Sequence, residues 1–401
     1  MKKTLLPLAL ILSSSAALAA PTEIQFWHSL AGSKPVVDKL IAAFNASQKD
    51  YVVKAEVVGN YREAETRLIA ALRAGSGPDL FGAEMSFFPK LAGDGALANL
   101  DALEKTLDPA FEKDFYPAVW NVGQYGGVRY GLPWNTSTPV LYYNATALAS
   151  KGLKPPKTWA EFEDVARKLS NRGSKGFIAV ADSWQFEQMV ASRGGSVVTP
   201  DGKPNFESKE VVDALEMLSR MSQSGAAIPR SLGEAQFAVL DFVRTKAFMA
   251  VASIANLTDI EPYSIAFKLG VAPMPCDKKC AVPLGGGQLV VLKNTTKEQQ
   301  AGAFAFWKFL MDPKNLEQWV EGSGYLSPRR ATLPLLQDFY KGDAQRKTAF
   351  EQLDQGFARP KLEQYATWRL FLEEAIEKVT KGRVPVKQAL AEAQKKALAV
   401  K

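Results

Sequence analysis

Short apolar segments alternate with longer amphipathic ones through the first hundred residues of the chain. Residues 23–30, 51–59 and 78–84 are rich in branched and aromatic side chains, which is typical of buried strands. Residues 33–48 and 61–77 instead repeat apolar side chains at the spacing of a helix. Strands that alternate with helices in this way predict an α/β fold with largely parallel strands.

The chain is too long for a single hydrophobic core. It has 401 residues, of which 47% are hydrophobic, whereas single cores stop growing beyond about 250–300 residues. We therefore expect two domains. In the second half, Thr158 and Glu161 have the spacing of a capping box at the start of a helix. No long linker separates the halves, so short crossings must join them. The candidates are residues 135–144, 268–275 and 324–328.

The start of the chain differs in character from the rest. Lys2 and Lys3 precede an apolar run from Leu5 to Leu12, and small residues end at Ala19. This order predicts a cleavable signal peptide over residues 1–19, whose apolar run is too short to span a bilayer. Because no cysteine stands at the cleavage site to carry a lipid, we expect an exported protein in the periplasm without a lipid anchor.

The cysteine content and the net charge limit the function classes. Cys276 and Cys280 are the two cysteines of an exported chain, which favours a small local disulfide loop. A metal half-site is the weaker interpretation, because no second pair and no nearby histidine complete it. The net charge of +7, which includes two lysines of the predicted signal peptide, suits an anionic ligand. Without a block of basic residues it does not indicate nucleic-acid binding.

Residues 135–144 raise a separate question. Asn135, Thr136, Ser137 and Thr138 are small and polar, yet they stand directly before the apolar run Val140 to Tyr143. The apolar run predicts a buried strand. The polar residues therefore serve another purpose.

Several motifs in order resemble one family. They are FWHS (26–29), GNY (59–61), NTSTPVLYYN (135–144), PPKTW (155–159), GGG (285–287), GSGYLSP (322–328) and WRLFLEEAIEKV (368–379). In this order they resemble the extracytoplasmic solute-binding proteins of ABC importers, most of all those that bind glycerol phosphate. The resemblance implies two α/β lobes joined by hinge crossings, with a ligand cleft between the lobes. It also implies a monomer that delivers its ligand to membrane permease subunits, without a cofactor or a metal.

The resemblance also assigns the binding residues one by one. The serine of the family's hinge motif matches Ser137, so the polar cluster would face the cleft where the chain crosses between lobes. The full set implied for ligand binding is Tyr61, Glu84, Ser137, Trp184, Ser253, Gly286, Tyr325 and Arg369.

Elementary chemistry supports some of these assignments. A phosphomonoester carries about −1.5 to −2 charge and needs donors and a cation in a dry cleft, and Arg369 offers a planar fork for it. A carboxylate repels phosphate, so we expect Glu84 at the other end of the ligand, accepting bonds from hydroxyl groups. The alternative for Arg369 is a surface residue paired with Glu373 one helical turn on.

Structural alternatives stay open for other members of the set. Trp184 either stacks on the carbon face of a polyol or fills a core. Ser137 and Ser253 are also common residue types at turns and helix caps. His28, the one histidine of the chain, is more simply explained as a hydrogen-bonded structural residue than as a ligand contact.

We therefore expect a binding protein for sn-glycerol 3-phosphate or a related glycerophosphodiester, with a neutral sugar or oligosaccharide as the alternative ligand. An enzyme is not favoured, because the single histidine accompanies no GxSxG motif and nothing selects a catalytic carboxylate pair. The predicted lobes are residues 20–135 with 275–325, and residues 136–274 with 326–401.

Overall fold

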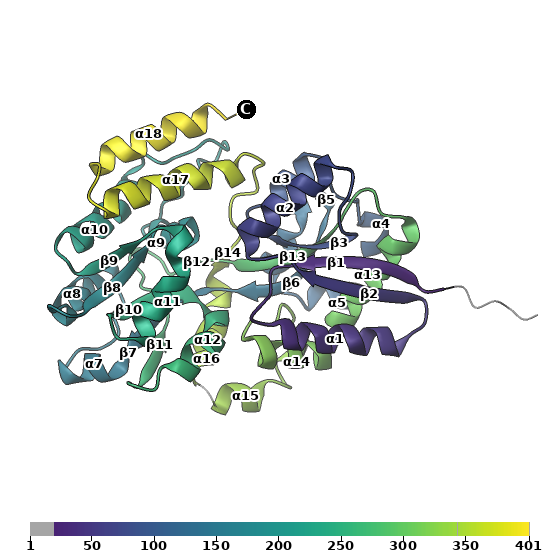
Figure 1. The fold of residues 1–401 in the computed structure, drawn as a ribbon, viewed down its shortest axis with the longest axis horizontal. Coiled ribbons are helices and arrows are strands. Elements are labelled where there is room, and N and C mark those ends of the chain that lie inside the picture. Colours follow the sequence, from purple (N-terminus) through teal and green to yellow (C-terminus); the bar gives the residue numbers. More distant parts are fainter. Residues whose placement is uncertain (1–19, 343, 401) are drawn as a thin grey trace, which may run out of the picture.

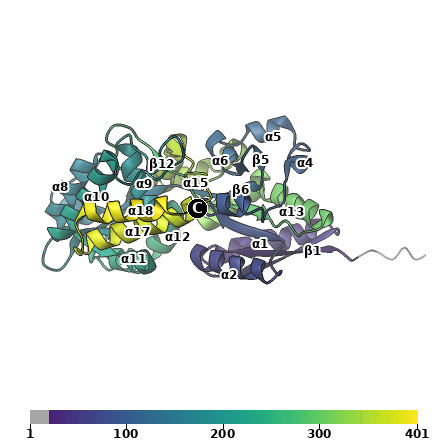
Figure 2. The ribbon, with the colours of Figure 1, turned by 90° about the horizontal axis from the view of Figure 1, so that it is seen from above.

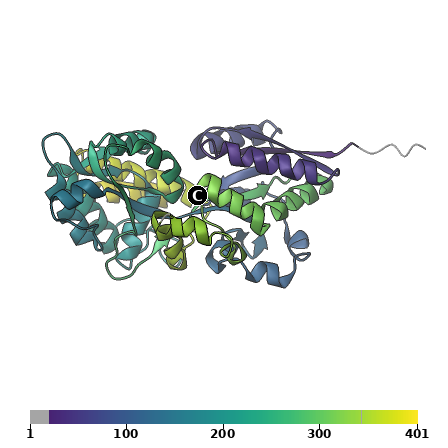
Figure 3. The same cartoon turned by 90° about the horizontal axis from the view of Figure 1, so that it is seen from below.

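Two five-stranded sheets organise the computed structural model, which describes residues 20–342 and 344–400 (Figure 1). The strand order is β2-β1-β3-β13-β6 in the first sheet and β11-β7-β10-β8-β9 in the second. Views from above (Figure 2) and below (Figure 3) show the two resulting lobes side by side. The predicted signal peptide, residues 1–19, lies outside the described residues.

The first sheet mixes parallel and antiparallel pairs, so the expectation of largely parallel pairing is wrong. Its strands are β1 (Thr22–His28), β2 (Tyr51–Val57), β3 (Leu80–Glu84), β6 (Gly131–Ser137) and β13 (Gly285–Val291). β1 runs parallel to β2 and β3, whereas β13 is antiparallel to both of its neighbours. The reason is connectivity: β13 enters from the other lobe, so it starts at the edge where β3 and β6 end.

The second sheet repeats this arrangement. Its strands are β7 (Pro139–Asn144), β8 (Lys175–Val180), β9 (Ala227–Arg230), β10 (Ala247–Ser253) and β11 (Leu269–Ala272). β8 is parallel to β9 and β10, and β7 is antiparallel to β10 and β11. β7 is the strand that enters from the first lobe, and Pro139 at its start pairs with Ser253 at the end of β10.

Helices cover both faces of the first sheet. Leu289 and Val291 face a core with α1 (Lys34–Ser47), α13 (Lys297–Leu310) and α14 (Pro313–Ser323). Val290 points to the other face, against α2 (Tyr61–Arg73) and α3 (Phe88–Gly93). This alternation is the two-residue period of a strand that is buried on both sides. Short elements complete the lobe: α4 (Asp101–Glu104), α5 (Pro109–Lys113), α6 (Pro117–Val122), β4 (Gln124–Tyr125) and β5 (Val128–Arg129).

The second lobe has two cores as well. One packs Leu141 of β7 against α8 (Trp159–Leu169), α9 (Ser183–Ser192), α10 (Lys209–Gln223), α17 (Tyr365–Thr380) and α18 (Val386–Leu398). The other packs Val140 and Tyr142 with α11 (Ala235–Val243), α12 (Leu257–Ile260) and α16 (Ala344–Glu351). α17 and α18 lie side by side on this lobe (Figure 2). The remaining helices of the α series are α7 (Ala145–Ser150) and α15 (Gln337–Gly342).

The chain passes between the sheets at short segments. Thr138 alone separates β6 from β7, and the path from β11 to β13 includes β12 (Val282–Pro283), which pairs with β14 (Gly356–Phe357). With the sheets as reference, we propose that Thr138 marks the first lobe boundary and that residues 273–284 form the second crossing. The predicted boundaries at 135, 275 and 325 stay predictions.

The start of α8 differs from its predicted capping box. The Thr158 hydroxyl accepts a hydrogen bond from the Glu161 amide at 3.1 Å, as a helix cap does. The Glu161 carboxylate, however, accepts from the amide of Lys157 at 2.7 Å rather than from that of Thr158. The reciprocal half of the predicted motif is therefore wrong.

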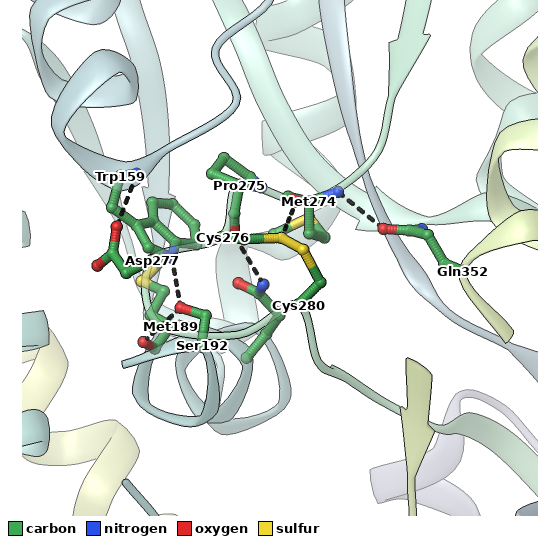
Figure 4. Close-up of a disulfide and its surroundings, with 10 residues drawn as sticks. Trp159, Met189, Ser192, Met274, Pro275, Cys276, Asp277, Cys280 and Gln352 are labelled. Atoms are coloured by element: carbon green, nitrogen blue, oxygen red, sulfur yellow. Dashed lines mark hydrogen bonds between the residues drawn. A yellow bond between two sulfur atoms is a disulfide. The ribbon is translucent and has the colours of Figure 1, made fainter. Parts of the chain in front are cut away.

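Cys276 and Cys280 form a disulfide, as predicted, in the second crossing (Figure 4). The loop that they close is tied to the second lobe: the amides of Lys278 and Lys279 donate to the Ser192 carbonyl at 2.9 and 3.1 Å. The metal half-site interpretation is wrong, because both thiols are consumed by the bond. No helix within the described ranges is long and apolar enough to cross a membrane.

The burial of β13 generates a stability prediction. Leu289 is fully buried at the centre of the first sheet, so Leu289→Ala should lower the free energy of unfolding by about 2–5 kcal/mol through lost burial and a residual cavity. The control Leu398→Ala, at a 59% exposed position, should change it by less than about 0.5 kcal/mol. Urea denaturation measures both, and equal effects would contradict the assigned core.

Candidate functional site

A cleft of about 450 Å³ lies between the two lobes. All the residues that the sequence analysis assigned to ligand binding line it: Tyr61, Glu84, Ser137, Trp184, Ser253, Gly286, Tyr325 and Arg369. A larger hollow of about 710 Å³ on the first lobe is lined by none of them. The structure therefore brings the predicted residues together, and their role in binding stays a prediction.

Strand ends place three of these side chains. Glu84, Ser137 and Ser253 are the last residues of β3, β6 and β10. Strands whose carboxyl ends face the same crevice commonly place their last side chains around a ligand. Ser253 also caps the following turn, since its hydroxyl accepts from the Ala255 amide at 3.2 Å. Ser253 therefore caps a turn, as the structural alternative predicted, and it also lines the cleft.

Two tyrosines and an amide form one wall of the cleft. The Asn135 side chain donates to the Tyr61 hydroxyl at 2.8 Å, and the Tyr325 ring stacks on Trp319 at 5.5 Å between centroids. Burial raises the pKa of Tyr61 well above its usual value and also raises the pKa of Tyr325. Both phenols stay neutral at physiological pH and can donate hydrogen bonds without adding charge.

Backbone forms the floor of the cleft at Gly285 and Gly286. Gly286 has φ of +94°, and a Cβ there would lie 1.7 Å from the Asn135 carbonyl oxygen. A Cβ on Gly285 would lie 2.5 Å from the Trp184 ring. The Trp184 indole N–H donates to the Pro283 carbonyl at 3.1 Å, while the half-buried ring lines the cleft. Trp184 thus combines the packing and cleft-facing roles that the sequence left open.

Arg369 on α17 is buried rather than exposed. Its side chain is 9% accessible, and Nη2 donates to both carboxylate oxygens of Glu65 at 3.0 and 2.9 Å. The alternative of a surface arginine paired with Glu373 is therefore wrong. The Nε–H of Arg369 is buried and has no hydrogen-bond partner. Burial alone would lower the pKa of Arg369, but Glu84 and Glu65 raise it overall, so the guanidinium stays charged.

Glu84 lies next to Arg359 and Arg369, so the carboxylate is not separated from the cation of the site; its expected contact with ligand hydroxyl groups stays a prediction. Its Oε1 accepts from Arg359 Nη1 at 3.2 Å, and its Oε2 lies 3.9 Å from Arg369 Nη1. The Ser86 amide also donates to it at 3.0 Å. Burial alone would raise the pKa of Glu84, but Arg359 and Arg369 lower it overall. Glu84 is therefore an ionised partner of both guanidinium groups.

Sequence reasoning missed Arg359 and its buried partners. Arg359 donates from Nε and Nη2 to Glu187, at 3.1 and 2.6 Å, and from Nη2 to the Ser183 hydroxyl at 3.1 Å. The Tyr365 hydroxyl also bonds to Glu187. Arg359 lies in the irregular segment between β14 and α17, where no periodicity marks it. A buried arginine in such a segment becomes visible only in the fold.

Carboxyl groups outnumber arginines in and directly behind the cleft. The arginines are Arg62, Arg359 and Arg369, and the acids are Glu63, Glu65, Glu84, Asp182, Glu187 and Glu373. Arg62 is paired with Glu373 across the lobes. Burial raises the pKa of Glu65 to about 7 and that of Asp182 to about 6. The charge of the site therefore changes near neutral pH.

His28 lies outside the cleft lining. Its Nδ1 accepts from the Leu30 amide at 3.2 Å, and burial lowers its pKa to about 4. It is thus a neutral, hydrogen-bonded structural residue, as the sequence favoured. Among the residues that the structure describes, no group of three or more His, Cys, Asp or Glu side chains is placed to hold a metal ion.

Comparison with known sequences gives a consistent result. The family model described as "Bacterial extracellular solute-binding protein" matches residues 39–348. The sn-glycerol-3-phosphate-binding periplasmic protein UgpB of Escherichia coli K12 is 30% identical over 413 aligned positions, which cover 96% of this chain and 93% of the relative.

Solved structures share the two-lobed fold. UgpB from Mycobacterium tuberculosis, in complex with glycerophosphocholine, has a TM-score of 0.85 at 22% identity and covers 94% of this chain and 98% of its own. The GacH receptor of Streptomyces glaucescens, solved without ligand and with acarbose, has a TM-score of 0.84 at 22% identity, with 94% and 97% covered. These likenesses confirm the predicted two-lobed α/β fold.

Close contact at Gly286 generates a prediction with a matched control. Gly286→Ala adds a clash with Asn135 to the strain of positive φ and should cost roughly 3 kcal/mol or more of stability. Gly75 also has positive φ, 67°, but its Cβ would meet nothing within 4 Å, so Gly75→Ala should cost only about 1–2 kcal/mol. Urea denaturation compares the two, and equal losses would contradict the tight floor of the cleft.

Proposed function

The chain belongs to the bacterial extracellular solute-binding proteins, and we propose that its ligand is sn-glycerol 3-phosphate or a related glycerophosphodiester. Binding proteins of this kind serve ABC importers, and the relatives named above are binding proteins rather than enzymes. The proposal extends to delivery of the bound ligand to the membrane permease by a monomeric protein in the periplasm, the compartment named for the E. coli relative.

The observation that carries the proposal is the unpartnered Nε–H of buried Arg369. Nearly all buried polar groups in proteins have a hydrogen-bond partner, so a buried, unpartnered N–H on a residue that lines the cleft supports a ligand acceptor. A phosphate oxygen is a strong acceptor for a guanidinium N–H. The neutral phenols of Tyr61 and Tyr325 would supply further donors without requiring a further counter-charge.

The rest of the cleft suits the polyol part of such a ligand. The face of Trp184 is available to the carbon skeleton, and the hydroxyl groups of Ser137 and Ser253 come from opposite lobes. A ligand that contacts both Tyr61 of α2 and Arg369 of α17 would bridge the lobes. Binding would then favour the closed arrangement, because the two contacts form together only when the cleft is closed.

A neutral sugar is the second candidate, and one observation favours it. Acidic groups outnumber the arginines around the cleft, and ionised carboxylates are good acceptors for sugar hydroxyl groups. Relatives in fold were solved with acarbose and with cycloalternan. The open guanidinium donor is the reason to rank the phosphate ester first, since a neutral sugar has no need of a buried cation.

Calorimetric titration of the mature protein with sn-glycerol 3-phosphate, glycerophosphocholine and maltose tests the proposal. We expect a phosphate ester to bind and maltose to give no heat. Arg369→Ala should weaken phosphate-ester binding by about 2–5 kcal/mol, because one partner of a buried charged hydrogen bond is lost. Arg383→Ala, which removes an exposed arginine after the same helix, should leave the affinity unchanged.

Two results would count against the proposal. Maltose binding in the absence of phosphate-ester binding would assign the protein to neutral sugars. Phosphate-ester affinity that is equal in Arg369→Ala and Arg383→Ala would remove Arg369 from the ligand contacts. Arg369→Lys provides a third comparison, because it keeps the positive charge but loses the planar fork.

A further inference from the structure

One edge of the Arg369 guanidinium is only half used. Its Nη2 donates to both oxygens of Glu65, whereas Nε is buried without a partner. Nε–H and one Nη–H of an arginine point along the same edge in a rigid fork. Arg129 uses such an edge fully, since its Nε and Nη2 both donate to Glu104 at 3.0 and 2.9 Å.

An anion that accepts from Nε of Arg369 would therefore share the guanidinium with Glu65. The Glu65 side chain is 14% accessible, so water screens little of the repulsion between the two negative groups. Like charges that share a buried site favour protonation of one of them. A carboxyl group can take up a proton near neutral pH, but a phosphodiester cannot.

Among the residues that the structure describes, every arginine near Glu65 already has an acidic partner. Arg62, on the same helix, is paired with Glu373, and Arg359 is paired with Glu187 and Glu84. Glu84 on β3 is itself negative and contributes repulsion toward Glu65. Each arginine near Glu65 is thus already paired with at least one carboxylate, and the carboxylates outnumber the arginines.

We propose that an anionic ligand enters this cleft together with one proton, which Glu65 takes up. The inference rests on the proposed function, because it requires a phosphate ester at Arg369. The proton moves from solvent to one carboxylate oxygen of Glu65. That oxygen can then donate a hydrogen bond, or it gives up its contact with Arg369 so that the ligand can take this place on the guanidinium. Glu65 thereby sets which net charge the cleft accepts.

The titration of Glu65 supports the proposal. Burial raises its pKa to about 7 against the lowering effect of Arg369, so the free protein is partly protonated there at neutral pH. A bound anion raises the pKa of Glu65 further. Between the pKa of Glu65 in the free protein and its higher pKa in the complex, the ligand affinity should fall about tenfold per pH unit as the pH rises, because each binding event consumes one proton.

Calorimetry in buffers of different ionisation enthalpy measures the proton uptake directly. Glycerophosphocholine is the suitable probe, because a phosphomonoester has its own pKa near about 6 and would add its own proton. At pH 8 we expect the native protein to take up close to one proton per ligand. Glu65→Gln should take up none and bind about tenfold more tightly than the native protein, because its amide needs no proton.

Glu56→Gln is the matched control. Like Glu65, Glu56 is paired with an arginine, but its partner is Arg67 of α2 and the pair lies on the exposed surface of the first lobe. This variant should show the proton uptake of the native protein. If only sn-glycerol 3-phosphate binds, the proton uptake by Glu65 is obtained as the difference between the native protein and Glu65→Gln. Any proton that the ester itself takes up is the same in both proteins and cancels in this difference.

The outcomes separate this inference from the proposed function. Binding with a heat that is independent of the buffer would overturn the inference and leave the function standing. Uptake that persists in Glu65→Gln but is lost in Asp182→Asn would overturn it too, by assigning the proton to Asp182. If neither ester binds, the proposed function fails and the inference falls with it.

Discussion

Two arginines that pair with carboxylates across the cleft join the lobes, and one of them, Arg369, is buried. A charge taken out of water costs several kcal/mol unless it is paired, and each arginine of the cleft has an acidic partner. Arg369 with Glu65 and Arg62 with Glu373 both join α17 of the second lobe to α2 of the first. These pairs position the lobes and leave the Nε–H of Arg369 buried without a hydrogen-bond partner.

The strand connections explain why polar groups converge there. Most strands of each sheet end at the cleft, and the one strand in each sheet that runs the other way, β13 or β7, starts there after crossing from the other lobe. The crossings are short, as Thr138 between β6 and β7 shows. Strand ends, crossings and helix starts therefore meet in one place, which is where side chains are free to face a ligand.

Sequence patterns anticipated much of this arrangement. The helices at residues 34–47 and 61–73 and the strands around them follow from apolar periodicity, and the residue set inferred from family motifs gathers in one cleft. The mixed sheet pairing was not anticipated, because strand direction depends on where a strand enters its lobe. Glu84 was placed far from Arg369 on the argument that carboxylates repel phosphate, which overlooked the second guanidinium, Arg359, that binds it.

The sequence by itself determined the two α/β lobes, the disulfide between neighbouring cysteines and the residue types that reach the cleft, because these depend on local periodicity and on ordered motifs. Only the tertiary structure decided how the charges are shared. Arg369 and Glu65 are 304 positions apart, and Arg359 lies in a segment without regular pattern. Ion pairing in a buried cleft depends on distances of a few ångströms between such remote side chains, and the linear order of residues does not contain those distances.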